Sequence, residues 1–181
     1  GNIASESARL QQLIERLLHL AQVEQRQGLE ECVAIPLRGV LDELSQAQAA
    51  RIERAGVQVE NQVVAGLQVQ GERFLLRQAL SNLLDNALDF TPPGGVLRWS
   101  ARGEGEQLWV CLFNSAPAIP DYALPRLTER FYSLPRPNTG RKSTGLGLNF
   151  VQEVASLHGG ALQVSNVPGG VEVCLRLPAV G

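Results

Sequence analysis

The chain has few aromatic residues and no surplus of either charge. Aromatic residues make up 5% of its 181 residues, and 16 Lys and Arg stand against 18 Asp and Glu, for a formal net charge of −2. A nucleic-acid surface needs clustered basic residues. The composition therefore argues against a DNA or RNA partner.

Cysteines are also few, and Cys32, Cys111 and Cys174 are widely spaced. This count and spacing fit neither a disulfide framework nor a set of metal ligands. Cys111 and Cys174 lie in the apolar runs 108–113 and 171–177. We expect the cysteines to be small buried side chains with free thiols in a reducing compartment.

No apolar run is long enough to span a membrane, and the sequence shows no signal peptide. A membrane-spanning helix needs about 20 mainly apolar residues. We therefore expect a cytosolic chain, with any membrane anchor in an upstream segment that it does not contain.

The first 30 residues predict one amphipathic helix. Apolar side chains recur at near-heptad spacing, at positions 3, 10, 13, 17 and 20. We expect Ser5 or Ser7 to cap the start of this helix and Gly28 to cap its end. The spacing favours packing on another helix. The alternative is an ordinary amphipathic helix that folds onto its own domain.

After Gly28 the pattern predicts a mixed α/β domain. We expect strands at 32–35, 57–63 and 67–69, a helix from Pro36 to about Arg54, a helix over 72–90, and a hairpin of 96–101 with 108–113. Residues 115–143 are rich in proline and have no lasting periodicity. A segment of this length and kind is usually a functional or mobile loop.

Two asparagines stand out in the predicted helix 72–90. Asn82 and Asn86 are four residues apart among leucines and alanines, so both amides lie on one helix face. Burying amides without partners costs free energy. They should therefore bind a ligand or hydrogen-bond to the chain itself, and a pair of satisfied core amides is the structural alternative.

A glycine-containing loop precedes the last predicted helix. It reads Ser143-Thr144-Gly145-Leu146-Gly147-Leu148-Asn149-Phe150, and the helix closes at Gly159-Gly160. Glycines let the backbone approach a ligand closely, and the N-terminus of a helix favours phosphate. Together with the twin-asparagine helix, the loop indicates a nucleotide site.

These segments resemble the catalytic, ATP-binding domain of sensor histidine kinases, the Bergerat-fold group that also includes gyrase, Hsp90 and MutL. The segment 82–92 resembles the N box, 129–132 the F box and 144–148 the G2 box, and 169–170 with 175–178 resemble the closing hairpin. The segments 89–92, 119–124 and 130–136 resemble most the CreC sensor kinases.

The resemblance implies an α+β fold, a two-layer sandwich whose mixed sheet is covered on one face by helices, preceded by a long helix. Residues 1–29 would be the second helix of the dimerisation and phosphoacceptor hairpin. Residues 30–181 would be the ATP-binding domain, with a lid at about 115–143.

The same resemblance implies a site for ATP and Mg²⁺. Asn86 is the expected Mg²⁺ ligand, because an amide oxygen is a hard donor. Asn82 and Arg130 are the expected catalytic residues, and cations such as Arg130 neutralise charge during phosphoryl transfer. The expected nucleotide-binding set is Asn82, Asn86, Phe90, Asn114, Ala116, Ala118, Ile119, Arg130, Lys142, Thr144, Gly145, Leu146, Gly147 and Leu148.

The sequence departs from the family in the segment 114–120. The family's G1 box reads Asp-x-Gly-x-Gly-Ile-Pro, whereas this chain has Asn114, Ala116 and Ala118 at the three signature positions. An amide accepts a hydrogen bond from the adenine amino group without the assistance of a charge. Asp89 stands where the family has a basic residue.

Neither His19 nor His158 has the sequence context of the phosphoacceptor, so both are expected to be structural. The resemblance therefore implies a catalytic fragment that transfers the γ-phosphate of ATP to a histidine outside this chain, and from there to an aspartate of a response regulator. The full-length kinase would be a homodimer anchored in the bacterial inner membrane.

Asn82 replaces the glutamate base of the hydrolytic members, which disfavours an ATPase. The alternative is a degenerate kinase domain that binds ATP weakly or not at all and acts as an interaction module.

Overall fold

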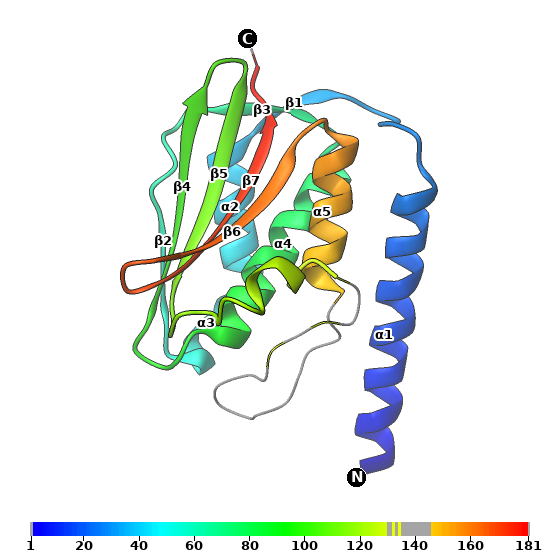
Figure 1. Ribbon diagram of the computed structural model, residues 1–181, viewed down its shortest axis with the longest axis vertical. Helices are drawn as coiled ribbons and strands as arrows, with labels where there is room; N and C mark the ends of the chain where they lie inside the picture. Colours follow the sequence, from blue (N-terminus) through cyan, green and yellow to red (C-terminus); the bar gives the residue numbers. More distant parts are fainter. Residues whose placement is uncertain (1, 130–131, 133, 135–145, 181) are drawn as a thin grey trace.

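A computed structural model gives the structure of the protein and describes residues 2–129, 132, 134 and 146–180 (Figure 1). Its helices and strands are α1 (Asn2–Gln25), β1 (Val33–Pro36), α2 (Leu37–Ala47), α3 (Ala49–Ala55), β2 (Gln58–Asn61), β3 (Gln68–Gly71), α4 (Arg73–Phe90), β4 (Val96–Glu104), β5 (Gln107–Ser115), the 3₁₀ helix η1 (Leu124–Arg126), α5 (Gly147–Leu157), β6 (Ala161–Val167) and β7 (Gly170–Pro178).

The main sheet has five strands in the order β2-β4-β5-β7-β6. β2 runs parallel to β4, and the other neighbours are antiparallel. β1 and β3 form a separate antiparallel pair. Helices α2, α4 and α5 lie on one face of the main sheet (Figure 1). This is the predicted two-layer α+β fold.

The core lies between these helices and the inner face of the sheet. Alternate residues of each strand point to this face, so Leu97 and Trp99 of β4 and Val110 and Leu112 of β5 are buried. The leucines of α4 meet them from the helix layer. The fold thereby fixes α4, the helix that carries Asn82 and Asn86, against the centre of the sheet.

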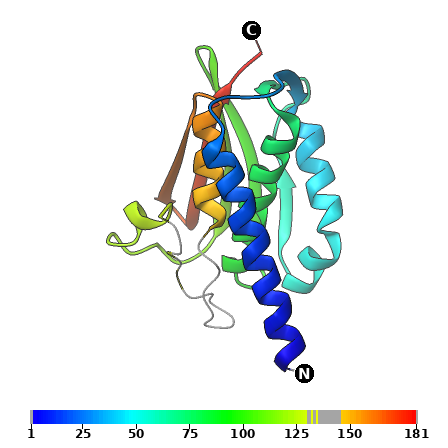
Figure 2. The same cartoon turned by 90° about the vertical axis from the view of Figure 1, so that its right-hand side faces the viewer.

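The C-terminal end of α1 packs on α5, where Leu20 and Val23 are buried. Figure 2 shows the rest of α1 running outward to the N-terminus. The apolar side chains Ile3, Leu10, Ile14 and Leu18 on this part are 56–86% exposed. Within the described residues, no helix has the length and hydropathy needed to cross a bilayer.

Two predictions about helix ends are wrong. α1 begins at Asn2, so Ser5 and Ser7 lie inside it, and it ends at Gln25, three residues before Gly28. The predicted helix from Pro36 to Arg54 is interrupted at Gln48, whose φ of −104° and ψ of 14° leave the helical region. The interruption separates α2, which has buried residues, from α3, which has none.

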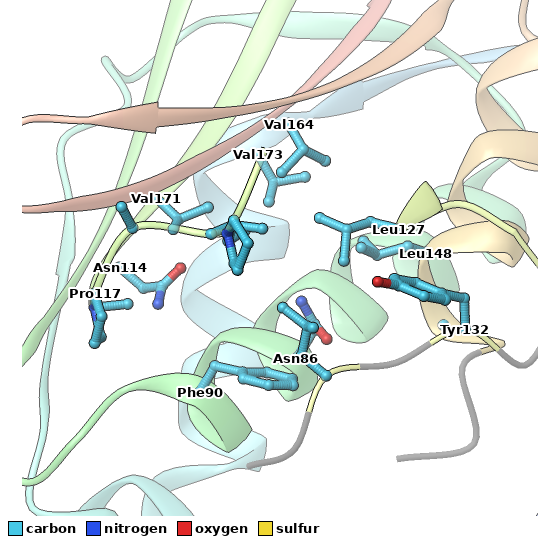
Figure 3. A pocket seen from close by; sticks show the side chains of 16 residues that line it. Asn86, Phe90, Asn114, Pro117, Leu127, Tyr132, Leu148, Val164, Val171 and Val173 are labelled. Atoms are coloured by element: carbon cyan, nitrogen blue, oxygen red, sulfur yellow. The ribbon is translucent and has the colours of Figure 1, made fainter. Parts of the chain in front are cut away.

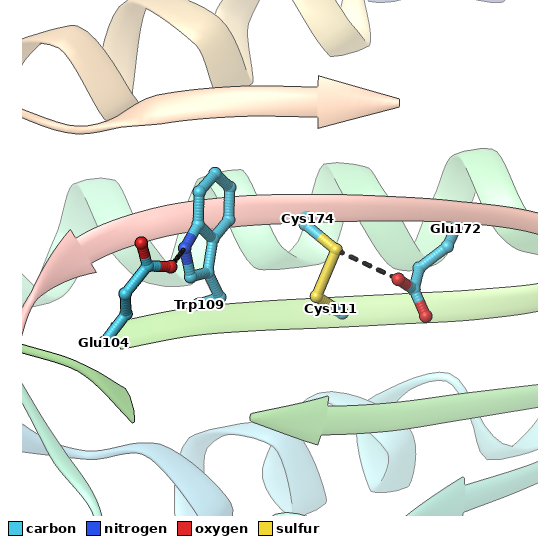
Figure 4. Close-up of a disulfide and its surroundings, with 5 residues drawn as sticks. All are labelled: Glu104, Trp109, Cys111, Glu172 and Cys174. Atoms are coloured by element: carbon cyan, nitrogen blue, oxygen red, sulfur yellow. Dashed lines mark hydrogen bonds between the residues drawn. A yellow bond between two sulfur atoms is a disulfide. The ribbon is translucent and has the colours of Figure 1, made fainter. Parts of the chain in front are cut away.

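The prediction about the cysteines is only partly right: Cys111 and Cys174 are buried as expected, but their thiols are not free. Cys111 and Cys174 form a disulfide between β5 and β7 (Figure 4), and Cys32 is exposed. The strand register sets Cys111 directly opposite Cys174, with 4.1 Å between their Cα atoms. This pairing depends on strand order, which local sequence patterns do not contain. A carboxylate oxygen of Glu172 lies 3.4 Å from the sulfur of Cys174.

Candidate functional site

A cavity of about 210 Å³ lies where α4, α5 and the ends of β5, β6 and β7 meet (Figure 3). Figure 3 shows Asn86 and Phe90 on one side, Val164, Val171 and Val173 on the opposite side, and Asn114 and Pro117 at one end. Its residues are Asn86, Phe90, Asn114, Ala116, Pro117, Ala118, Ile119, Pro120, Leu127, Tyr132, Leu134, Gly147, Leu148, Val164, Val171 and Val173. A small number of polar groups on apolar walls is typical of small-molecule sites.

The two amides of α4 have no hydrogen-bond partner among the described residues. Both side chains are half-buried, and Asn86 lines the cavity. Among the described residues, no contact supports the structural alternative of a satisfied core pair. The oxygen of Asn86 remains available to a cation, which is the chemistry that Mg²⁺ requires.

Asn114, near the end of β5, contributes the second amide of the cavity. It is 6% exposed, and its Nδ2 donates a long hydrogen bond of 3.4 Å to the carbonyl of Ser115. The hydroxyl of Ser115 accepts a hydrogen bond from the N–H of Val96 at 3.0 Å, which ties the ends of β4 and β5 together. The amide of Asn114 is thus held at the wall of the cavity.

The loop that follows β5 continues this wall with residues 116–120. The side chain of Asn166 on β6 holds it by two hydrogen bonds to Ile119. The N–H of Ile119 donates to Oδ1 at 2.8 Å, and Nδ2 donates to the carbonyl of Ile119 at 2.9 Å.

Gly147, the first residue of α5, lines the cavity at the N-terminus of that helix. A Cβ atom added here would meet no atom within 4 Å. The absence of a side chain therefore leaves open space that a ligand can use, as the glycine pattern predicts. Asn149 of the same helix donates a hydrogen bond of 2.6 Å to the carbonyl of Thr128, which joins α5 to the segment that follows η1.

The cavity brings together eight of the predicted ligand residues: Asn86, Phe90, Asn114, Ala116, Ala118, Ile119, Gly147 and Leu148. Asn82 lies one turn before Asn86 and does not line it, and Leu146 is buried in the core. Arg130, Lys142, Thr144 and Gly145 lie outside the described residues. A second cavity of about 450 Å³, between α1 and α4, contains none of the predicted ligand residues.

Several residues at or beside the cavity are not among those predicted from the sequence. Three of them, Val164, Val171 and Val173, belong to the inner faces of β6 and β7. The alternation of apolar and polar residues along a strand predicts which side chains face the core, but it does not predict which of them line a cavity. Tyr132 belongs to the F-box segment, and Arg126 lies 4.4 Å from the centre of its ring. No local pattern indicated Asn166.

A buried polar network holds the start of α4. Arg26 donates hydrogen bonds of 2.7 Å and 2.5 Å to the carboxylate of Glu72, and its guanidinium lowers the pKa of Glu72 to about 2. The N–H of Glu72 donates to Nε2 of His158 at 3.1 Å, and Nδ1 of His158 lies 2.8 Å from the carbonyl of Val154. Burial lowers the pKa of His158. His158 is thus buried and hydrogen-bonded, which is consistent with the structural role expected for it.

A second ion-pair network lies on another side of α4. Arg51 of α3 binds Asp85 at 2.8 Å and Asp89 at 2.6 Å. Burial raises the pKa of Asp85, although Arg51 opposes this effect. Asp89 stands where the family has a basic residue. Its carboxylate therefore forms an ion pair with Arg51 on the neighbouring helix.

Comparisons with known proteins agree with this arrangement. Residues 71–181 match the family described as histidine kinase-, DNA gyrase B-, and HSP90-like ATPase. The sensor protein CreC of Escherichia coli K12 is 42% identical over 97% of this chain and 37% of its own length. The sensor histidine kinase CusS of Escherichia coli O157:H7 is 32% identical over 97% of this chain and 36% of its own length. The chain spans little more than a third of these relatives.

Solved structures of histidine kinases have the same fold. Acinetobacter baumannii AdeS gives a TM-score of 0.81 at 21% identity, over 99% of this chain and 83% of that one. ThkA in complex with the response regulator protein TrrA gives a TM-score of 0.78 at 22% identity, over 98% of this chain and 49% of that one. The cytoplasmic segment of QseC gives a TM-score of 0.64 at 22% identity, over 96% of this chain and 95% of that one. The chain belongs to the histidine kinase-, DNA gyrase B- and HSP90-like ATPase family, and its relatives are sensor histidine kinases.

Proposed function

We propose that this chain is the catalytic fragment of a two-component sensor histidine kinase, which binds Mg²⁺–ATP and transfers the γ-phosphate to a histidine outside the chain. The observation that carries the proposal is the cavity at Asn86, Asn114 and Gly147, because residues from three separate parts of the predicted site line it. The family match to ATPases supports nucleotide as its ligand.

Asn86 would hold Mg²⁺ through its amide oxygen, with phosphate and water oxygens completing the coordination. The metal ion would neutralise charge on the phosphates during transfer. Asn114 would accept a hydrogen bond from the adenine amino group, and Phe90 would pack on the adenine or ribose side. Among the residues outside the described part, Arg130 and Lys142 are proposed to contact phosphate, and Thr144 and Gly145 to continue the phosphate loop.

Asn82 is assigned a catalytic role beside Asn86 on the same helix face. An amide cannot accept a proton from water at neutral pH. This chemistry supports transfer to a histidine, which is itself a nucleophile, over the hydrolysis of ATP by an activated water molecule.

The proposed partners are a response regulator and a second copy of the full-length kinase. The exposed apolar stripe of α1 supports helix–helix packing in a hairpin, and residues 1–29 are proposed as its second helix. Residues 30–181 are proposed as the ATP-binding domain. We assign the domain to the cytoplasmic side of an inner-membrane protein, as in the cytoplasmic segment of QseC.

Binding of a non-hydrolysable ATP analogue tests the proposal. In the presence of Mg²⁺ the parent should bind the analogue, whereas Gly147→Val should lose binding because the new side chain fills open ligand space. Gly39→Val is the matched control, because Gly39 is also near the start of a helix with no atom within 4 Å of an added Cβ. No binding by the parent would favour the alternative, an interaction module without nucleotide.

A further inference from the structure

The wall of the cavity formed by residues 116–120 has no regular secondary structure. Pro117 and Pro120 lack an N–H group, so this segment has few backbone donors. In the part of the chain that the structure describes, the hydrogen bonds of residues 116–119 are the two between Ile119 and Asn166. The course of the wall therefore depends on one distant side chain.

Asn166 stands beside the cavity without lining it. Val164, two residues earlier on β6, and Val171, its partner across the β6–β7 ladder, both line the cavity. The amide reaches over this edge to residue 119, which is 47 positions away in the sequence. Asn166 can thus affect a bound ligand only through the loop.

We propose that Asn166 is a positioning residue for nucleotide binding, which fixes Ile119 and thereby holds the loop 116–120 in the course that forms the cavity wall. The inference rests on the proposed function for its ligand. An amide suits this role because it donates and accepts at the same time, as a neighbouring strand would. A carboxylate at this position cannot donate a hydrogen bond to the carbonyl of Ile119, and its negative charge would repel that carbonyl oxygen.

Two variants and one control test the role of Asn166. Asn166→Leu has similar size but removes both hydrogen bonds, and Asn166→Asp removes the donor. Ser165→Ala is the control, because Ser165 directly precedes Asn166 on β6 and points to the other face of the sheet. Affinity for a non-hydrolysable ATP analogue with Mg²⁺ should fall about tenfold in both Asn166 variants and change less than about twofold in the control.

Hydrogen exchange of the Ile119 amide in the absence of nucleotide gives a second readout. In Asn166→Leu, exchange of the Ile119 N–H should become faster and exchange in α4 and the sheet should remain unchanged, since Asn166 is exposed and outside the core. Asn166→Asp keeps the acceptor of this N–H, so this variant is tested by affinity alone. Unchanged exchange of the Ile119 N–H in Asn166→Leu overturns the proposal, and so does faster exchange throughout the domain, because it would mean a general loss of structure. If exchange changes locally but affinity stays the same, the loop is held by Asn166 without setting nucleotide binding, and the proposal is wrong.

The two readouts separate this inference from the proposed function. If the parent binds no nucleotide, the proposed function fails and the nucleotide part of this inference fails with it, whereas exchange still decides whether Asn166 holds the loop. If the parent binds and the Asn166 variants bind equally well, only the inference fails.

Discussion

Arg26 and Glu72 join the end of α1 to the start of α4 by two parallel hydrogen bonds, of 2.7 Å and 2.5 Å. Their side chains are 18% and 10% exposed, and the N–H of Glu30 also donates to Glu72 at 2.9 Å. A bidentate ion pair that is shielded from water contributes more than an exposed pair. This pair therefore fixes α1 relative to the helix that carries Asn86.

Replacing Arg26 should weaken the fold because it leaves the carboxylate of Glu72 shielded and without its cation. Arg26→Met should lower the free energy of unfolding by about 2 kcal/mol. The control is Arg77→Met, since Arg77 and its partner Glu43 are 45% and 62% exposed, and it should cost less than about 1 kcal/mol. Urea denaturation of the three proteins measures both values, and equal losses would contradict the importance of shielding.

The same pair should respond to acid. The pKa of Glu72 is lowered from 4.5 to about 2 by its hydrogen bonds with Arg26, so its contribution is present above about pH 4.5 and is lost as the pH falls toward 2. The stability difference between the parent and Arg26→Met should therefore shrink over this window. A difference that stays constant down to pH 2 would mean that the two residues are not paired in solution.

His158 predicts a second pH dependence at higher pH. Burial lowers its pKa below the ordinary value of 6.5, so the unfolded chain takes up a proton more readily and stability falls as the pH drops below about 6.5. His158→Gln cannot take up this proton, and its stability should change less between pH 7 and pH 5 than that of the parent. Denaturation at a series of pH values measures this, with His19→Gln controlling for loss of a histidine from the exposed surface of α1. An identical slope in the parent and His158→Gln would contradict the prediction.

The Cys111–Cys174 disulfide closes a long loop, since its cysteines are 63 residues apart. Such a crosslink restricts the unfolded chain, and reduction should lower the free energy of unfolding by about 2–4 kcal/mol. A dithiol reductant should have this effect on the parent and on Cys32→Ser but not on Cys111→Ser. If reductant changes the stability of none of the three, the pair is not oxidised in solution.

The altered loop after β5 gives a prediction about affinity. Changing Asn114→Asp, Ala116→Gly and Ala118→Gly together should tighten ATP binding by about tenfold, through charge assistance to the hydrogen bond with adenine and closer approach of the loop backbone to the nucleotide. Calorimetry on the parent, the single change Asn114→Asp and the triple variant tests this. The single change should favour ATP over GTP, and the two glycines should improve both nucleotides alike. No change in the triple variant would show that the loop already holds adenine well.

Sequence patterns predicted the elements that surround the site because their signals are local. Helical periodicity and the amide pair placed α4 within one residue of its observed start at Arg73, and alternation with a glycine turn gave the hairpin of β4 and β5. The pattern could not predict features that depend on how distant strands pair. The opposition of Cys111 and Cys174 depends on the register of β5 with β7, and the contact between Asn166 and Ile119 joins segments 47 residues apart. The break at Gln48 was missed because no glycine or proline lies between residues 40 and 55 to mark a helix end.

The central claim is that the cavity binds a nucleotide whose phosphates share a Mg²⁺ ion with Asn86. Calorimetric titration with a non-hydrolysable ATP analogue, in Mg²⁺ and in EDTA, tests it on the parent, Asn86→Ala and Asn82→Ala. The parent should bind about tenfold or more tightly in Mg²⁺ than in EDTA, Asn86→Ala should lose most of this difference, and Asn82→Ala should keep more of it. Absence of binding by the parent in either buffer, or equal losses for Asn86→Ala in Mg²⁺ and in EDTA, would contradict the account.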